Sequence, residues 1–114
     1  MATRDTFYNT ASSFPEITVE PHFEKTSFRI KNKIFATLSS NEENAVVKLS
    51  PLNQSVFCSF DKKIIYPVKG KWGLLGWTMI DLKKIKNAML KDILTNAYCE
   101  VAPKSLSEHV ANKP

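Results

Sequence analysis

The sequence predicts a two-layer α+β domain in which helices cover one face of an antiparallel sheet. Three observations indicate this fold class. Several short stretches alternate apolar and polar side chains, as half-buried strands do. Short turns separate neighbouring strands, and strands joined by short turns run antiparallel. A stripe of apolar residues near the C-terminus repeats at helical spacing, which is typical of a helix packed on a sheet.

The first half of the chain is expected to hold one helix and three strands. The helix spans about residues 4–13, because Phe7, Ala11 and Phe14 recur at helical spacing before Pro15 ends it. The next residues, 16–25, are expected to be turn-like or extended. Asn32-Lys33 forms the turn between the first two strands, and a polar loop covers 39–44. The three strands are expected at 26–31, 33–38 and 45–49.

The second half begins with a helix at Ser50-Pro51, a cap residue followed by an N1 proline. This helix runs to about Ser59 and is expected to turn four apolar side chains inward: Leu52, Val56, Phe57 and Phe60. A long helix over about 84–102 carries the apolar stripe, and Pro103 stops it. Between the helices lie two further strands, 63–68 and 76–82. The predicted order is α-β-β-β-α-β-β-α, with a weakly helical or frayed tail from Lys104.

Composition indicates one domain, with its core at about 4–103 of the 114 residues. No apolar run is long enough to span a membrane, and the N-terminus lacks an apolar signal region. We therefore expect a cytoplasmic monomer. Cys58 and Cys99 are expected to be buried, inert thiols and not a disulfide.

Positive charge is concentrated in the middle of the chain. The net charge is +5, but residues 1–24 carry −3, 25–48 carry +3 and 60–91 carry +6. Clustered lysines are typical of a surface that meets a polyanion, although lysines also simply solvate small proteins.

Residues for catalysis or metal binding are sparse. His22 and His109 are the two histidines of the chain, and neither has a partner that suggests a site. Asp81 is expected to pair with a lysine or to cap the next helix. No paired-cysteine or histidine metal spacing occurs, and no helix is expected after the glycines. We therefore expect no enzyme activity, cofactor or metal.

A glycine–tryptophan loop, residues 68–77 (VKGKWGLLGW), holds all three glycines and both tryptophans. Its demanding backbone and large aromatic residues fit the tip of the last hairpin. Trp77 lies in an alternating strand, which favours a core position. For Trp72, flanked by glycine and lysine, core packing and contact with a partner both remain open.

Four blocks of sequence resemble a known family. They are residues 22–38 (HFEKTSFRIKNKIFATL), 47–49 (VKL), 68–77 and 97–104 (AYCEVAPK). Together they resemble blocks of the MmcQ/YjbR proteins in the same order, over about residues 4–106. The resemblance implies a compact α/β sandwich related to the CyaY-like group. It also implies DNA binding through a double-wing surface.

The resemblance and the charge pattern give a DNA-binding hypothesis with two basic hairpin tips as wings. Lysines would contact phosphate without reading sequence, Arg29 would form a fork, and Trp72 could stack on an exposed base. Binding is expected to be weak and salt-sensitive. The candidate contact residues are Arg29, Lys31, Lys33, Lys69, Lys71 and Trp72.

An alternative is a protein- or small-ligand-interaction module without a nucleic-acid role. Its surface would be an aromatic face made of Phe35, Tyr66, Trp72 and Trp77. Iron binding, which the CyaY-like relationship raises, is rejected because iron needs a carboxylate-rich ridge. The first helix carries only Asp5, and Glu16 and Glu20 lie beyond it.

Overall fold

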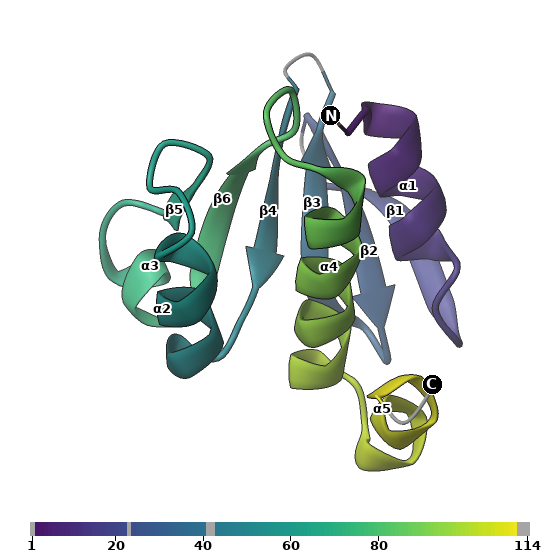
Figure 1. Cartoon of the computed structure of the whole chain (residues 1–114). Coiled ribbons are helices and arrows are strands. Elements are labelled where there is room, and N and C mark those ends of the chain that lie inside the picture. The colour runs from purple at the N-terminus through teal and green to yellow at the C-terminus, as the bar shows by residue number, and fades with distance from the viewer. Residues whose placement is uncertain (1, 23, 41–42, 112–114) are drawn as a thin grey trace.

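A six-stranded antiparallel sheet carries helices on one face and leaves the other face open in the computed structural model, which describes residues 2–22, 24–40 and 43–111 (Figure 1). The strands are β1 (Ile17–His22), β2 (Lys25–Ile30), β3 (Lys33–Ser39), β4 (Asn44–Lys48), β5 (Ile65–Pro67) and β6 (Trp77–Asp81). The helices are α1 (Arg4–Ser12), α2 (Pro51–Cys58), α3 (Lys71–Leu74), α4 (Asn87–Val101) and α5 (Lys104–Ala111). The order across the sheet is β1-β2-β3-β4-β6-β5, so the predicted fold class is confirmed.

The first two helices begin at the side-chain caps that their sequences provide. The hydroxyl of Thr3 accepts the Thr6 backbone N–H at 3.0 Å, and the hydroxyl of Ser50 accepts that of Asn53 at 3.1 Å. Pro51 occupies the first turn of α2, where its missing N–H costs no hydrogen bond. The long α4 begins later than expected, because the residues before it form a turn in which the Asp81 carboxylate accepts the backbone N–H of Lys83 at 3.0 Å.

The core lies between the sheet and the helices α1, α2 and α4. Tyr98 of α4 is fully buried at its centre, stacked on Phe14 with 4.8 Å between ring centroids and edge-on to Phe35 at 5.7 Å. Its hydroxyl donates to the Pro15 carbonyl oxygen at 2.8 Å, so the one polar atom of this ring is satisfied. The predicted stripe on α4 is confirmed: five of its six residues, Leu90, Ile93, Leu94, Ala97 and Tyr98, are buried, and the last, Val101, is half-buried against the core.

The β2–β3 hairpin differs from the prediction by one residue at its turn. Ile30 pairs with Lys33, so Lys31 and Asn32 form the turn, both with positive φ (51° and 67°). Two-residue hairpin turns require this conformation, which Asn tolerates well. A β-bulge then follows at Phe35, since Phe28 pairs with Ala36 and Arg29 pairs with Ile34.

Two elements were not anticipated, and a third, expected as a weakly helical or frayed tail, is a full helix. Residues 17–22, expected to be turn-like or extended, form β1 and pair along the whole of β2. A one-turn helix, α3, follows Gly70, where no helix was expected. The tail folds into α5, which packs on α4. Residues 41 and 42 of the expected polar loop lie outside the described part of the chain, as do the side chains of His22 and His109.

The predicted inward face of α2 is wrong for three of its four residues. Phe57 is buried, but Leu52, Val56 and Phe60 are exposed, Leu52 by 74%. The helix packs on β5 at the outer part of the sheet, and Gln54 reaches the Trp77 carbonyl oxygen and the Thr78 hydroxyl of β6 (Figure 1). Phe57 is the apolar residue of this helix that is buried there, and Leu52 and Val56 face outward.

Both edge strands contain a proline, as is usual where a missing N–H does not interrupt the ladder. Pro21 lies in β1 and Pro67 in β5. On the inner side of β5, the Val68 backbone N–H donates to the Trp77 carbonyl oxygen at 3.0 Å. The neighbouring position, Pro67, therefore faces the outer edge.

Candidate binding groove on the open sheet face

Alternate residues of the central strands point away from the helices and form the open face. Thr37 pairs with Val46, and Val46 pairs with Met79, so these side chains form a row across β3, β4 and β6. Their neighbours along each strand, including Leu38, Val47 and Ile80, are buried in the core. The alternation of the strands thus separates the core from a second surface without helical cover.

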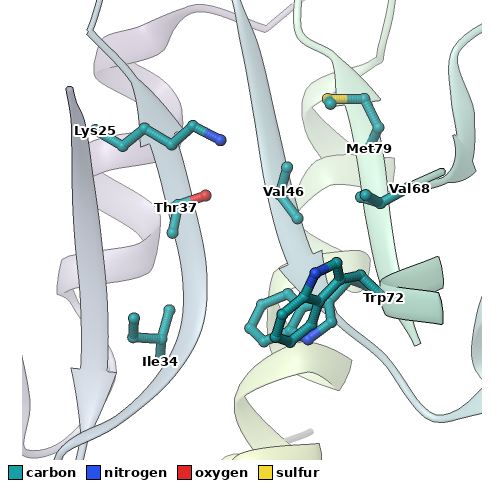
Figure 2. Close-up of a pocket in the computed structure, with 8 residues that line it drawn as sticks. Lys25, Ile34, Thr37, Val46, Val68, Trp72 and Met79 are labelled. Carbon is teal, nitrogen blue, oxygen red and sulfur yellow. The ribbon is translucent and has the colours of Figure 1, made fainter. Parts of the chain in front are cut away.

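This surface contains a groove of about 470 Å³. Strand residues form its floor, and Val68 and Trp72 close it on the side of α3 (Figure 2). Lys25 of β2 lies at the opposite end, so an ammonium group and an indole face the same groove (Figure 2). The lining residues are Lys25, Ile34, Thr37, Val46, Val68, Trp72, Trp77 and Met79.

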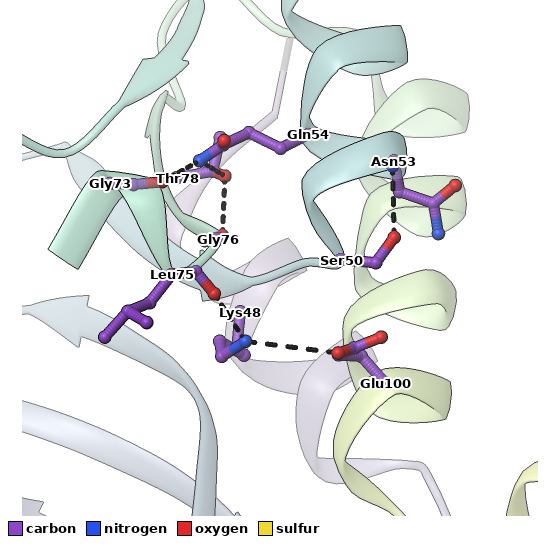
Figure 3. A network of polar contacts seen from close by, with 9 residues as sticks. All are labelled: Lys48, Ser50, Asn53, Gln54, Gly73, Leu75, Gly76, Thr78 and Glu100. Atoms are coloured by element: carbon purple, nitrogen blue, oxygen red, sulfur yellow. Dashed lines mark hydrogen bonds and ion pairs between the residues drawn. The ribbon is translucent and has the colours of Figure 1, made fainter. Parts of the chain in front are cut away.

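Polar contacts fix α3, and with it the backbone of Trp72 (Figure 3). Nε2 of Gln54 in α2 donates to the Gly73 carbonyl oxygen at 2.9 Å. Nζ of Lys48, at the end of β4, donates to the Leu75 carbonyl oxygen at 2.6 Å and lies 4.0 Å from the carboxylate of Glu100. The Leu75 carbonyl oxygen thereby gains a partner, and the Gly73 carbonyl oxygen, which also accepts the Gly76 backbone N–H at 3.0 Å, gains a further one.

The glycines of the loop allow its backbone to pass close to the rest of the sheet. A Cβ atom on Gly73 would lie 2.0 Å from the Val68 carbonyl oxygen, and one on Gly76 would lie 1.8 Å from that of Leu49. Gly76 also has a φ of 107°, and Gly70, before α3, has a φ of 80°. The glycines therefore let the loop pack closely against the rest of the sheet, and this packing fixes the position of the Trp72 backbone.

The side chain of Trp72 is 57% exposed, whereas Trp77 is half-buried in the groove. Lys69 and Lys71 precede Trp72 in the chain and are exposed. Among the described residues, no carboxylate lies within 4.0 Å of either ammonium group. This part of the predicted site, an exposed tryptophan preceded by two exposed lysines, lies in one short segment of the loop and α3.

The other predicted tip contains Arg29, Lys31 and Lys33, and it lies at the same end of the sheet. There β3 begins, β4 ends and β6 begins, as the pairs Ala36–Val47 and Lys48–Trp77 show. Lys33 is exposed. The two tips are thus on one edge of the molecule, on either side of β4.

Acidic residues partly neutralise this second tip. The carboxylate of Glu16 lies 2.8 Å from Nζ of Lys31, and that of Glu20 lies 3.9 Å from Nε of Arg29. Nε of Arg29 also donates to the Ser27 hydroxyl at 3.0 Å. The N-terminal segment is acidic and the middle of the chain is basic. Folding brings these opposite charges together, because β1 lies beside β2.

The aromatic face of the alternative hypothesis is only partly formed. Phe35 was placed on this face and is instead fully buried beneath α4, because the bulge turns it inward. Tyr66 pairs with Met79 and shares its face, on the edge strand β5. With Trp72 and Trp77, three of the four predicted aromatic residues lie on the open face.

The remaining candidates for chemistry form no cluster. Cys58 and Cys99 are free and half-buried, and burial raises the pKa of both thiols. Within the described ranges, no three His, Cys, Asp or Glu side chains lie close enough together to hold a metal ion. No helix in the described part of the chain is both long and apolar enough to cross a bilayer.

Sequence reasoning missed most of the groove. It identified Trp72 but not the groove residues on the central strands: Thr37, Val46 and Met79. The sequence did contain a signal for them, because they occupy the alternate strand positions that face away from the core. The groove itself depends on the pairing of β4 with β6, which brings together strands far apart in the sequence.

The fold is that of an α+β protein whose antiparallel sheet has helices on one face and a groove on the other. The chain belongs to the YjbR family, whose model matches residues 12–100, and the resemblance noted in the sequence is thereby confirmed. The crystal structure of Deinococcus radiodurans protein DR2400, with a DUF419 domain, is similar in fold. It has a TM-score of 0.78 at 16% identity, over 97% of this chain and 89% of that chain. The comparison with curated proteins gives no match.

Proposed function

We propose that the protein binds nucleic acid, without catalysis, along the sheet edge where the two basic tips lie. The observation that carries this proposal is that the exposed Trp72, preceded by the exposed Lys69 and Lys71, lies on a one-turn helix whose backbone is held by hydrogen bonds. Lysine ammonium groups act on phosphates as point charges, and an exposed indole offers a stacking surface. Such contacts position a polyanion and read little sequence.

The two tips are expected to contribute unequally. Lys31 already has a carboxylate at 2.8 Å and Arg29 has one at 3.9 Å, so each meets a phosphate only in competition with an acid. Lys69 and Lys71 have no such competitor among the described residues. We therefore assign the larger share of the phosphate contacts to α3 and the loop before it.

A gel-shift or filter-binding assay at ~50 mM salt tests this function, since weak electrostatic binding is strongest at low salt. We expect Lys69→Ala with Lys71→Ala to weaken binding more than Lys31→Ala with Lys33→Ala. The variant with all four changes should weaken it most, for all sequences alike. Lys83→Ala with Lys84→Ala is the matched control, because these exposed lysines follow Asp81 at the opposite end of the sheet.

Absence of binding by the wild-type protein at this salt would overturn the proposed function. The alternative, an interaction module for a small ligand or a protein, is favoured by the groove, whose volume of about 470 Å³ and mostly apolar lining are usual for ligand sites. In that case an apolar fluorescent probe should bind, and Met79→Glu in the groove floor should abolish its binding. A nucleic-acid target accords with a cytoplasmic location and a monomer, and sedimentation equilibrium checks the monomeric state.

A further inference from the structure

The groove on the open face has one end suited to an aromatic ring and another suited to an anion. Trp72 lies at one end with more than half of its side chain accessible, and Lys25 lies at the other (Figure 2). Between them the lining is mostly apolar and includes Val46 and Met79. Among the eight lining residues Lys25 is the one charged side chain, and no carboxylate is present.

We propose that this groove takes an unpaired base of a single-stranded nucleic acid, with the base against Trp72 and a neighbouring phosphate at Lys25. The inference rests on the proposed function and narrows it from nucleic acid in general to the single-stranded form. A base in a duplex has both faces covered by its neighbours. Away from the ends of a duplex, a base presents a face to an indole only at the cost of unstacking, which an unpaired base does not incur. Every base has such a face, so stacking does not require a particular sequence.

The charges around the groove mark a path for the backbone of the strand. Lys25 of β2 lines the groove at one end, and Lys69 and Lys71 directly precede Trp72, which lines the other, in the loop and in α3. Within the described residues, none of these three lysines has a carboxylate within 4.0 Å. A strand that crosses the sheet from β2 to α3 would therefore meet an ammonium group on each side of the bound base, without displacing an existing ion pair.

The support of Trp72 lowers the cost of this binding. The hydrogen bonds from Gln54 to Gly73 and from Lys48 to Leu75 hold α3 before any ligand arrives. Binding then orders little protein backbone, so more of the stacking energy appears as affinity.

An acidic peptide with an aromatic residue would use the same two ends of the groove. The experiment below distinguishes such a peptide from a nucleic acid.

The test measures the affinity of the full chain for a fluorescein-labelled oligothymidine by anisotropy, beside a duplex of equal length. We expect the single strand to bind at least tenfold more tightly at the same salt, and to quench the tryptophan fluorescence. Trp72→Leu should weaken single-strand binding about tenfold or more and should leave duplex binding nearly unchanged. Phe60→Leu is the matched control, since Phe60 is an exposed aromatic residue beyond α2.

Lys25→Gln tests the anionic end of the groove. It should lower the slope of log K against log salt for the single strand by about 0.7, the value for one phosphate contact. Lys91→Gln, on the exposed side of α4, makes the same charge change and should leave the slope less affected. Thermal unfolding of each variant confirms that it is folded, which the exposure of Trp72 leads us to expect.

Three outcomes overturn the inference. Equal affinity for single strand and duplex, with no effect of Trp72→Leu, would overturn it and leave the proposed function intact. No binding of either form would overturn both. Quenching of the tryptophan fluorescence by an acidic peptide, with none by the oligonucleotide, would assign the groove to a peptide.

Discussion

Nζ of Lys31 lies 2.8 Å from Oε1 of Glu16, and both residues adopt a positive φ, 51° and 60°. Lys31 is in the β2–β3 turn, and Glu16 is in the turn that leads from α1 into β1. The pair therefore joins two turns at one end of the sheet. It also ties a lysine of the predicted wing to an acid from the N-terminal segment.

Removing the acid should increase the affinity for nucleic acid. In Glu16→Gln the Lys31 ammonium group no longer has a competing carboxylate, so we expect binding at ~50 mM salt to strengthen about two- to fivefold, the range for an exposed ion pair. Titration of a labelled oligonucleotide measures this change. Glu108→Gln is the control, because it removes the acid 3.9 Å from Lys104 on α5. An unchanged affinity in Glu16→Gln would mean that the β2–β3 tip does not contact the ligand.

Gln54 is expected to stabilise the glycine–tryptophan loop, whereas its exposed neighbour Ser55 is not. Its Nε2 lies 2.9 Å from the Gly73 carbonyl oxygen and 3.2 Å from the Thr78 hydroxyl. Gln54→Ala should lower the free energy of unfolding by about 1–3 kcal/mol, because these partners lose a donor in a partly buried place. Urea unfolding measures this, and Ser55→Ala, on the exposed side of α2, should change it little. Equal effects of the two changes would contradict the role given to Gln54.

Gly70 and Gly76 should differ in their tolerance of alanine. Gly70→Ala meets no atom within 4 Å and adds only backbone strain at φ 80° and ψ −159°, a conformation found essentially only in glycine, so we expect a loss of about 1–3 kcal/mol. Gly76→Ala combines a φ of 107° with a Cβ 1.8 Å from a carbonyl oxygen. There we expect a loss of about 3 kcal/mol or more, or no folded protein. Thermal unfolding ranks the two variants, and the reverse order would show that the loop is not held as described.

Stability should fall at alkaline pH. Burial raises the pKa of the Cys58 and Cys99 thiols, and the pKa of Tyr98 is raised first by burial and then by the charges of Glu16 and Cys99. The unfolded chain therefore releases these protons at lower pH than the native state does. The free energy of unfolding is then fully retained below about pH 8.5, the ordinary thiol range, and declines above it.

Urea unfolding between pH 7 and pH 10 measures this decline. The double variant Cys58→Ser with Cys99→Ser should lack the part of the decline that begins at the lower pH, and should keep the part due to Tyr98. Alkylation of the native thiols at pH 8 should also be slower than that of the unfolded chain, because less thiolate is present. Stability that stays constant up to pH 10 would contradict the assigned direction.

Most of the fold was readable from periodicity, and the exceptions have physical causes. The stretch that forms β1 contains Pro21 between Glu20 and His22, so its sequence is not typical of a strand. Ile17 and Val19 nevertheless pack on the core, because β1 pairs with β2. The outward side chains of α2 could not be read from hydrophobicity, since exposed apolar residues are common. Which of them are buried depends on how α2 packs on β5.

The site was predicted only where its residues are close in the sequence. Lys69, Lys71 and Trp72 lie within one loop, and their exposure follows from the glycines around them. The groove floor needs the register of three strands, and Lys25 reaches it from a fourth. The neutralising effect of Glu16 and Glu20 depends on β1, so the missed strand also explains the overestimated basic wing.

Pro67 on the outer edge of β5 has a consequence for how copies of this protein behave at high concentration. An incoming strand would find a gap in the row of hydrogen-bond donors at this position, and Pro21 lies in the strand at the other edge of the sheet. Growth of the sheet from molecule to molecule is thereby discouraged, as in other proteins that resist fibril formation. The groove on the sheet face is thus open to a ligand, while the prolines make the two edges of the sheet poor templates for another chain.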